Sequence, residues 1–225
     1  MPSSIVFELL KAASLAISAL FPIVNPLGGS PIFLSLTGDY DRAERHALAR
    51  LIGMNSFFLL AGSYLIGAHI LAFFGISLPV VQVGGGLIVI STGWTMLHRG
   101  GDEERKEVHR NIEPKDQSRE AFYPLTLPLT VGPGSISVAV TLGANAPHEY
   151  PAKLATIAGA LIGSAAIGLS VYLCYGFADR LARILGPTAM SVIMRLSSFL
   201  LVCIGVQILW NGLHALLSSM PPIGR

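Results

Sequence analysis

The longest uncharged stretch of this chain decides what it can fold into. Between Arg50 and Arg99 lie 48 residues without a single Asp, Glu, Lys or Arg. Four further uncharged stretches, each of 25 to 29 residues, follow Lys11, Glu120, Lys153 and Arg195. A membrane-spanning helix needs about 20 mostly apolar residues, so every one of these stretches is long enough to cross a bilayer. With 12% charged residues, the chain has too few polar side chains to cover the surface of a soluble fold.

The 48-residue stretch is too long for one span. As a single helix it would measure about 72 Å, against a hydrocarbon core of about 30 Å, and Gly75 and Pro79 interrupt it. A membrane β-barrel is disfavoured because its strands have only about 10 residues of alternating polarity. We therefore predict an all-α membrane protein with six spans, at about 8–36, 47–73, 79–98, 121–145, 153–177 and 192–217.

The positions of the basic residues predict the orientation in the membrane. If the N-terminus faces outward, the inner loops are about 37–50, 99–120 and 178–195. These loops contain 12 of the 15 Lys and Arg residues. The positive-inside rule then predicts a multi-pass membrane protein with both termini on the outer side, which for a protein of an inner (plasma) membrane is the periplasm. Because topology already accounts for the basic residues, no nucleic-acid-binding face is expected.

Three spans on each side of a charged loop suggest an internal duplication. We predict a first three-helix repeat in residues 1–98, a charged cytoplasmic linker in 99–120, and a second three-helix repeat in 121–225. Because three is odd, the second repeat would enter the membrane from the opposite side, as in many secondary transporters. Shifting the chain by 106 residues brings Pro22 onto Pro128 and Gly28 onto Gly134.

The first span of each repeat contains a cluster of helix-breaking residues. The clusters are Pro22, Pro26, Gly28, Gly29 and Pro31, and Pro124, Pro128, Gly132, Pro133 and Gly134. A Pro inside a helix costs about 3 kcal/mol and a Gly about 1 kcal/mol, so the pattern predicts unwound backbone within both spans. New half-helices are expected to begin at Ser30-Pro31 and at Gly134-Ser135, because Ser suits a helix N-cap and Pro the first helical position.

Unwound backbone inside a bilayer must pack against protein or line a wet cavity. We predict that the two segments meet near the midplane, where half-helix N-termini bind a carboxylate and the opposing carbonyls bind an ammonium group. The small surrounding residues favour a small neutral amino acid. The predicted substrate-binding residues are Asn25, Pro26, Gly28, Gly29, Ser30, Thr126, Thr130, Gly132, Gly134 and Ser135. In the alternative interpretation, the Pro and Gly residues only kink helices for packing, and the polar side chains only bond helices to each other.

The sequence offers no sign of a cofactor or of catalysis. The predicted spans lack clustered carboxylates and histidines, which disfavours a metal site. They also lack a helical His/Glu pair, a Gly-x-Ser-x-Gly sequence and paired carboxylates, so an enzyme is not expected. Cys174 and Cys203 lie inside predicted spans as small apolar groups. The expected partners are the lipid bilayer and a small neutral amino acid, and a homo-oligomer is left open.

Two segments resemble the MarC/SnatA family of inner-membrane proteins. The family pattern Asn-Pro-x-Gly-x-x-Pro-x-Phe matches residues 25–33, and Pro-Leu-Thr-x-Pro-Leu-x-x-Gly-Pro-Gly matches residues 124–134. The resemblance extends to residues 75–79, 84–88 and 195–207. It implies six helices in inverted repeats and transport of small neutral amino acids such as glycine and alanine. A non-transporting integral membrane protein of the MarC type, with a stress or assembly role, is the alternative.

Overall fold

The computed structural model describes residues 2–98, 117–147 and 149–219. Within these ranges the chain forms helices joined by short turns, and no strand. In chain order the elements are α1 (Pro2–Val24), α2 (Pro26–Leu36), α3 (Arg42–Phe73), α4 (Leu78–His98), α6 (Gln117–Glu120), η2 (Ala121–Thr130), α7 (Pro133–Ala144), α8 (Ala152–Gly176) and α9 (Ala178–Ser218). The predicted all-α class is confirmed.

Five helical segments of the described chain are each long and apolar enough to cross a membrane, and α1 and α2 together form the first, Ile5–Leu36. A sixth span exists if the pair Ser118–Thr130 and Pro133–Ala144, bent by 74°, counts as one. The predicted spans 47–73, 79–98 and 153–177 lie within five residues of α3, α4 and α8. Helix α9 begins well before the predicted 192, and Gly186, at φ 73°, separates its first turns from the apolar part that starts at Thr188.

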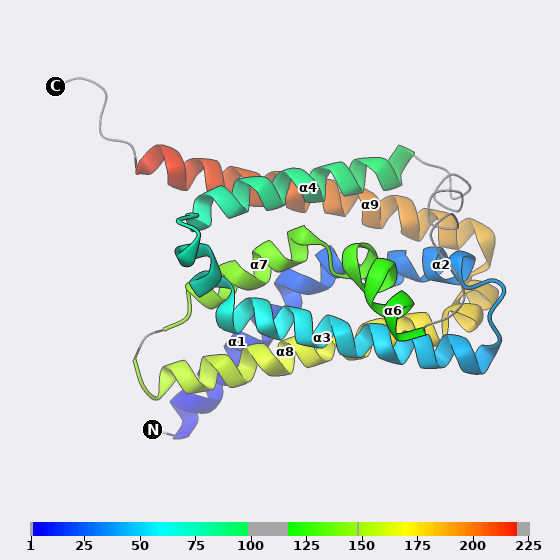
Figure 1. Ribbon diagram of the computed structural model, residues 1–225, viewed down its shortest axis with the longest axis horizontal. Coiled ribbons are helices and arrows are strands. Elements are labelled where there is room, and N and C mark those ends of the chain that lie inside the picture. Colours follow the sequence, from blue (N-terminus) through cyan, green and yellow to red (C-terminus); the bar gives the residue numbers. More distant parts are fainter. Residues whose placement is uncertain (1, 99–116, 148, 220–225) are drawn as a thin grey trace.

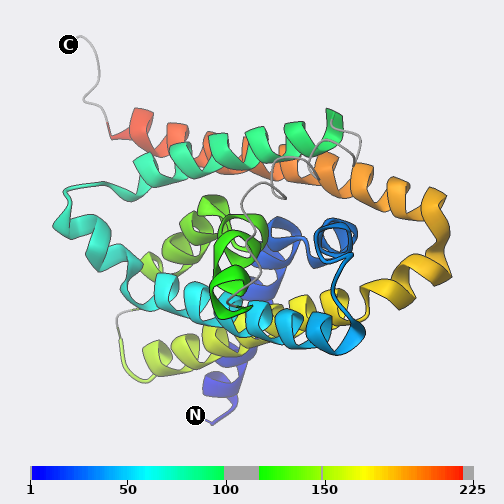
Figure 2. The same cartoon turned by 45° about the vertical axis from the view of Figure 1, so that its right-hand side comes forward.

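The long helices lie roughly along one axis, so the molecule has two ends (Figure 1). Helix α9 runs beside α4, α8 packs against both α1 and α3, and α7 packs against α3 and α4. In the view of Figure 1, α1 begins and α9 ends on the left-hand side, and the turned view again shows α9 beside α4 (Figure 2). Most of the predicted linker, residues 99–116, lies outside the described residues, and residues 117–120 form α6.

Glycines allow the closest helix crossings. A Cβ atom on Gly53 of α3 would lie 2.6 Å from the carbonyl oxygen of Gly168 of α8, and a Cβ on Gly168 would lie 2.6 Å from the Gly53 oxygen. Gly86 of α4 and Gly205 of α9 face each other in the same way, at 2.8 and 2.9 Å. Small residues let membrane helices approach until their backbones touch. Backbone contact at these two crossings therefore joins the first three spans to the last three.

Local signals set the ends of α3. Its N-terminus has a capping box, in which the Asp41 carboxylate accepts from the Glu44 N–H at 2.8 Å and the Glu44 carboxylate accepts from the Asp41 N–H at 2.9 Å. Its C-terminus is followed by Gly75 at φ 68°, a backbone conformation that suits glycine. The predicted break between the second and third spans is confirmed there.

Candidate functional site

The first helix break is narrower than predicted. Only Asn25 leaves the right-handed helical region, at φ 48° and ψ 57°, and its Oδ1 accepts from the Gly28 N–H at 3.1 Å. The backbone bonds continue across it, because the Asn25 N–H donates to the Phe21 oxygen and the Gly29 N–H donates to the Asn25 oxygen, both at 2.9 Å. The prediction of a long unwound stretch is therefore wrong here. Asn tolerates the left-handed conformation and supplies its own cap, so one residue suffices for the break.

The predicted helix start at Ser30-Pro31 is also wrong. Helix α2 begins at Pro26, so Pro26 and not Pro31 occupies the first helical position. Ser30 lies inside α2, fully buried, and its hydroxyl donates to the Leu27 carbonyl oxygen at 2.9 Å. Ser30 therefore packs within the helix and does not cap one.

The second break is wider than the first. Tyr123 and Leu127, each of which precedes a proline, leave the helical region inside η2, as the steric restriction before proline predicts. The Thr126 hydroxyl donates to the Ala121 carbonyl oxygen at 2.6 Å, and the Thr130 hydroxyl donates to the Leu125 carbonyl oxygen at 2.7 Å. These two buried hydroxyls satisfy carbonyl groups that a regular helix would pair with N–H groups.

Helix α7 begins at Pro133, one residue before the predicted start at Gly134-Ser135. Its N-cap residue is Gly132, in extended conformation, and no side chain bonds to the first turn. The first turn of α7 thus keeps backbone N–H groups without a side-chain acceptor, whereas the Asn25 side chain caps α2.

The two breaks come together at Tyr175 of α8. Its side chain is 2% exposed, and its hydroxyl lies 3.1 Å from the Thr130 Oγ1 of η2. On the other side, a Cβ atom on Gly29 of α2 would lie 2.5 Å from the same hydroxyl. The Tyr175 ring stacks on Phe33 with centroids 4.7 Å apart. One buried hydroxyl therefore contacts both interrupted segments.

The other predicted site residues have neighbours other than Tyr175. A Cβ atom on Gly28 would collide with the Asn25 side chain, and one on Gly134 would collide with Val89 of α4. Thr126 lies 3.5 Å from the Asn55 amide nitrogen of α3. Pro26 and Ser135 are buried, and Gly132 is half-buried beside the Pro128 carbonyl oxygen. Their role in ligand binding stays a prediction.

Sequence reasoning missed Tyr175. A single tyrosine among apolar residues gives no pattern that distinguishes it from Tyr172. One chemical signal was available, because a hydroxyl near the end of an apolar span needs a partner. The sequence does not show which residue that partner is, since Thr130 lies 45 residues away.

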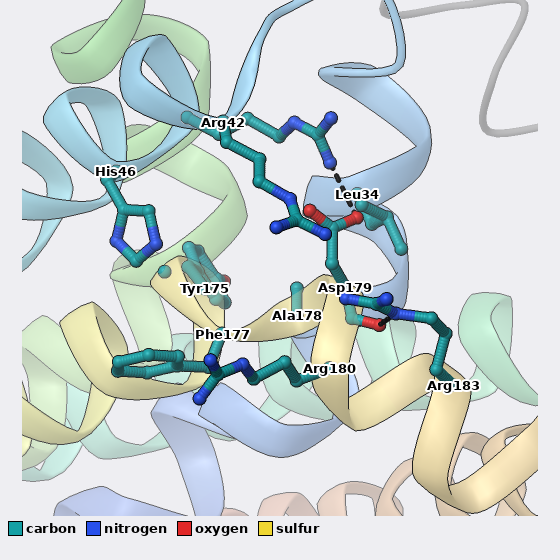
Figure 3. A pocket seen from close by; sticks show the side chains of 11 residues that line it. Leu34, Arg42, His46, Tyr175, Phe177, Ala178, Asp179, Arg180 and Arg183 are labelled. Carbon is teal, nitrogen blue, oxygen red and sulfur yellow. Dashed lines mark hydrogen bonds and ion pairs between the residues drawn. The ribbon is translucent and has the colours of Figure 1, made fainter.

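An arginine-rich cavity of about 100 Å³ lies next to Tyr175 (Figure 3). Helices α3 and α9 supply its charged lining and His46, and Phe177 lies between α8 and α9; the charged residues are Arg42, Arg45, Asp179, Arg180 and Arg183. Tyr175 also lines it, so this one side chain separates the cavity from the junction of the two breaks.

Polar contacts tie the helices together around this cavity. The Arg45 guanidinium pairs with the Asp179 carboxylate at 2.6 Å, joining α3 to α9. The same guanidinium donates from Nε and Nη2 to the Tyr40 carbonyl oxygen, at 3.2 and 3.0 Å. The Tyr40 hydroxyl donates to the Glu120 carboxylate, which links the α2–α3 turn to α6. Burial and this bond to Glu120 raise the pKa of Tyr40 well above its usual range, so the hydroxyl stays protonated as the donor.

Comparison with known proteins identifies the family of this chain. Residues 10–217 match the MarC family of integral membrane proteins. The chain belongs to this family. The inner membrane protein MarC of Salmonella typhimurium is 31% identical over 223 residues, covering 94% of this chain and 98% of the relative. MarC of Citrobacter koseri is 30% identical with the same coverage. The membrane protein YvbG of Bacillus subtilis is 31% identical over 199 residues, covering 88% and 92%.

These relatives establish the chain as a MarC-family integral membrane protein, and those named MarC are inner membrane proteins. The apolar helices agree with a multi-pass protein of the inner membrane. No solved structure matches the chain.

Proposed function

We propose that the chain is a carrier of small neutral amino acids of the size of glycine and alanine, working by alternating access. The observation that carries this proposal is the meeting of the two broken segments at the Tyr175 hydroxyl, through Gly29 and Thr130. Broken helices that face each other within a span form the substrate sites of many secondary transporters.

The unequal caps favour one position for the substrate carboxylate. The first turn of α7 has no side-chain acceptor, so the N–H groups of Gly134 and Ser135 are suited to an anionic group. The first turn of α2 already uses the Asn25 side chain. We therefore propose that the carboxylate binds at α7. Gly134 and Ser135 of this first turn are small and buried, which favours a substrate with a small side chain.

The helix packing supports an inverted repeat. Exchanging the first three spans with the last three turns the pair α1–α8 into η2–α3, and the pair α2–α9 into α7–α4. The packed pairs α1–α8, α3–η2, α2–α9 and α4–α7 all occur. The two half-helices also begin with prolines 107 residues apart, Pro26 and Pro133, close to the shift of 106 in the sequence.

The proposed orientation gives each end a role. Under the positive-inside rule the arginine-rich cavity faces the cytoplasm, and Tyr175 then closes the path from the cytoplasm to the junction. Release into the cytoplasm requires Tyr175 to move away from Thr130 and requires the pair of Arg45 with Asp179 to separate. Both contacts join different helices, so relative helix motion breaks them together.

Counterflow in proteoliposomes tests the proposal. Vesicles preloaded with unlabelled alanine are expected to accumulate labelled glycine when they contain the purified chain. Gly28→Leu and Gly134→Leu should abolish exchange, because the new side chains collide with Asn25 and Val89. Gly84→Leu is the matched control, since a Cβ atom there meets nothing within 4 Å.

The second candidate is a non-transporting MarC-type membrane protein. One observation favours it: none of the ten predicted site residues lines the arginine-rich cavity or either of two further cavities, which lie beside Tyr64. The same assay separates the two candidates. Absence of glycine and alanine exchange by folded wild-type protein would reject the carrier and leave the second candidate.

A further inference from the structure

A second buried tyrosine, Tyr64 of α3, has a hydroxyl without a hydrogen-bond partner among the described residues. Its side chain is 8% exposed. Burying a hydroxyl without a partner is unfavourable, so such a group in a native structure calls for a partner outside the chain, such as water, an ion or a ligand.

Tyr64 lines two cavities. Their other lining residues come mainly from the N-terminal part of α1, the last turns of α3, the end of α7 and the start of α8, and these parts of the helices lie opposite to the junction of α8 and α9 (Figure 1). The cavity volumes are about 190 and 370 Å³. Ala146 and Pro147, which follow α7, line both cavities with Tyr64. At these volumes each cavity is large enough for a small organic molecule together with water.

Charged groups of both signs line these cavities. Glu8 and Lys11 of α1 line the smaller one, and His69 and Lys153 line the larger one. Glu8 and Lys11 lie 3.8 Å apart and belong to the same helix, with side chains 32% and 62% exposed. Such exposed pairs are weak, so both groups remain able to bind a ligand. A pure anion or a pure cation would meet a like charge here, whereas a zwitterion meets a complementary group at each end.

We propose that the two cavities around Tyr64 form an outer binding site for the zwitterionic amino acid, in front of the site at the broken helices. The Tyr64 hydroxyl donates to the substrate carboxylate, Lys153 adds a positive charge beside it, and Glu8 attracts the ammonium group. This inference rests on the proposed carrier function. It adds a second binding site on the substrate path, which is reached from one face of the membrane.

Tyr64→Phe is the decisive variant because it removes only the hydroxyl. Since that hydroxyl has no partner among the described residues, its loss leaves folding intact. Losing a hydrogen bond to a charged group is expected to raise the half-saturation concentration about tenfold. Glu8→Gln, at a half-buried surface position, should raise it in the same direction. Tyr172→Phe on α8 is the matched control, since Tyr172 lines neither cavity.

The substrate must be added to each face of the membrane separately. Uptake of labelled glycine is compared in right-side-out and everted membrane vesicles, each with wild type and variants. We expect the half-saturation concentration of Tyr64→Phe to rise only when substrate is added at the face that carries the start of α1. A merely structural defect would change both faces equally, and that result, or no change at either face, overturns the outer site.

The wild type separates this inference from the proposed function. If wild-type vesicles transport no small neutral amino acid, the carrier function is wrong and the outer site falls with it. If wild-type vesicles transport glycine and Tyr64→Phe behaves as wild type, only the outer site is wrong.

Discussion

The two ends of the molecule treat a buried tyrosine hydroxyl in opposite ways. At the end formed around Tyr175, the hydroxyl bonds to Thr130 and the ring stacks on Phe33. At the end formed around Tyr64, the hydroxyl has no partner within the described residues and lines two cavities. We call these the Tyr175 end and the Tyr64 end. A buried tyrosine thus packs between helices at the Tyr175 end, whereas at the Tyr64 end a buried tyrosine lines two cavities.

A glycine lies beside each tyrosine, and its contact differs in the same way. At the Tyr175 end, Gly29 makes room for the hydroxyl itself. At the Tyr64 end, Gly143 of α7 makes room for the backbone carbonyl of Tyr64 and not for its hydroxyl. The Tyr175 hydroxyl is thus part of helix packing, whereas the Tyr64 hydroxyl is not.

The ion pairs of the two ends differ as well. At the Tyr175 end, the pair of Arg45 with Asp179 joins α3 to α9. At the Tyr64 end, the pair of Glu8 with Lys11 stays within α1. For an alternating-access carrier, opening at the Tyr175 end breaks the ion pair between α3 and α9.

The crossing of α3 and α8 lies between the two ends and should matter to both. Gly53→Val places side-chain carbons against the Gly168 carbonyl oxygen, and a backbone atom cannot move aside. We expect a loss of about 3 kcal/mol in unfolding free energy, measured by reversible unfolding in mixed detergent micelles. Gly62→Val on the same helix is the control, because a Cβ atom there meets nothing within 4 Å. Equal stability of the two variants would contradict the close crossing.

Gly29→Ala should disturb the Tyr175 end alone. Its new methyl group would lie 2.5 Å from the Tyr175 hydroxyl, and overpacking of this kind costs about 1–3 kcal/mol, partly offset by the better helix propensity of Ala. Combining it with Tyr175→Phe removes the closest atom, so the double variant should recover stability relative to the sum of the two single losses. Strict additivity in this double-mutant cycle would mean that the two residues do not touch.

The pair of Arg45 with Asp179 should contribute about 1 kcal/mol, because both side chains are only partly exposed. Arg45→Gln is expected to lower the unfolding free energy by this amount and to favour opening of the Tyr175 end. The exchanged variant Arg45→Asp with Asp179→Arg keeps the ion pair and should recover part of the loss. If the exchanged variant recovers neither stability nor transport, the pair does not hold α3 to α9.

Charge and hydropathy predicted the spans of this fold well, because long uncharged stretches permit few other structures. They did not predict how far each break unwinds. Asn25 confines the first break to one residue with a single side-chain hydrogen bond, whereas the residues before Pro124 and Pro128 widen the second. Counting Pro and Gly treats both clusters alike, since the count ignores which side chains replace the lost backbone bonds. Tyr175 escaped prediction for a related reason: its partners lie on α2 and η2, far away in the sequence.

The smallest effects on unfolding free energy are expected for the two variants that each remove one tyrosine hydroxyl, one at each end of the molecule. Tyr175→Phe removes a buried hydrogen bond and should lower the unfolding free energy by about 1 kcal/mol. Tyr64→Phe removes a hydroxyl that bonds to nothing in the described chain, so stability should stay within about 0.5 kcal/mol of wild type or increase. Unfolding of both variants in the same micelles, without substrate, gives the two values. Equal losses would mean that the Tyr64 hydroxyl has a structural partner after all, and the distinction between the Tyr175 end and the Tyr64 end would fail. Adding glycine then separates ligand from packing: it should stabilise wild type more than Tyr64→Phe, because only wild type offers the hydroxyl to the carboxylate.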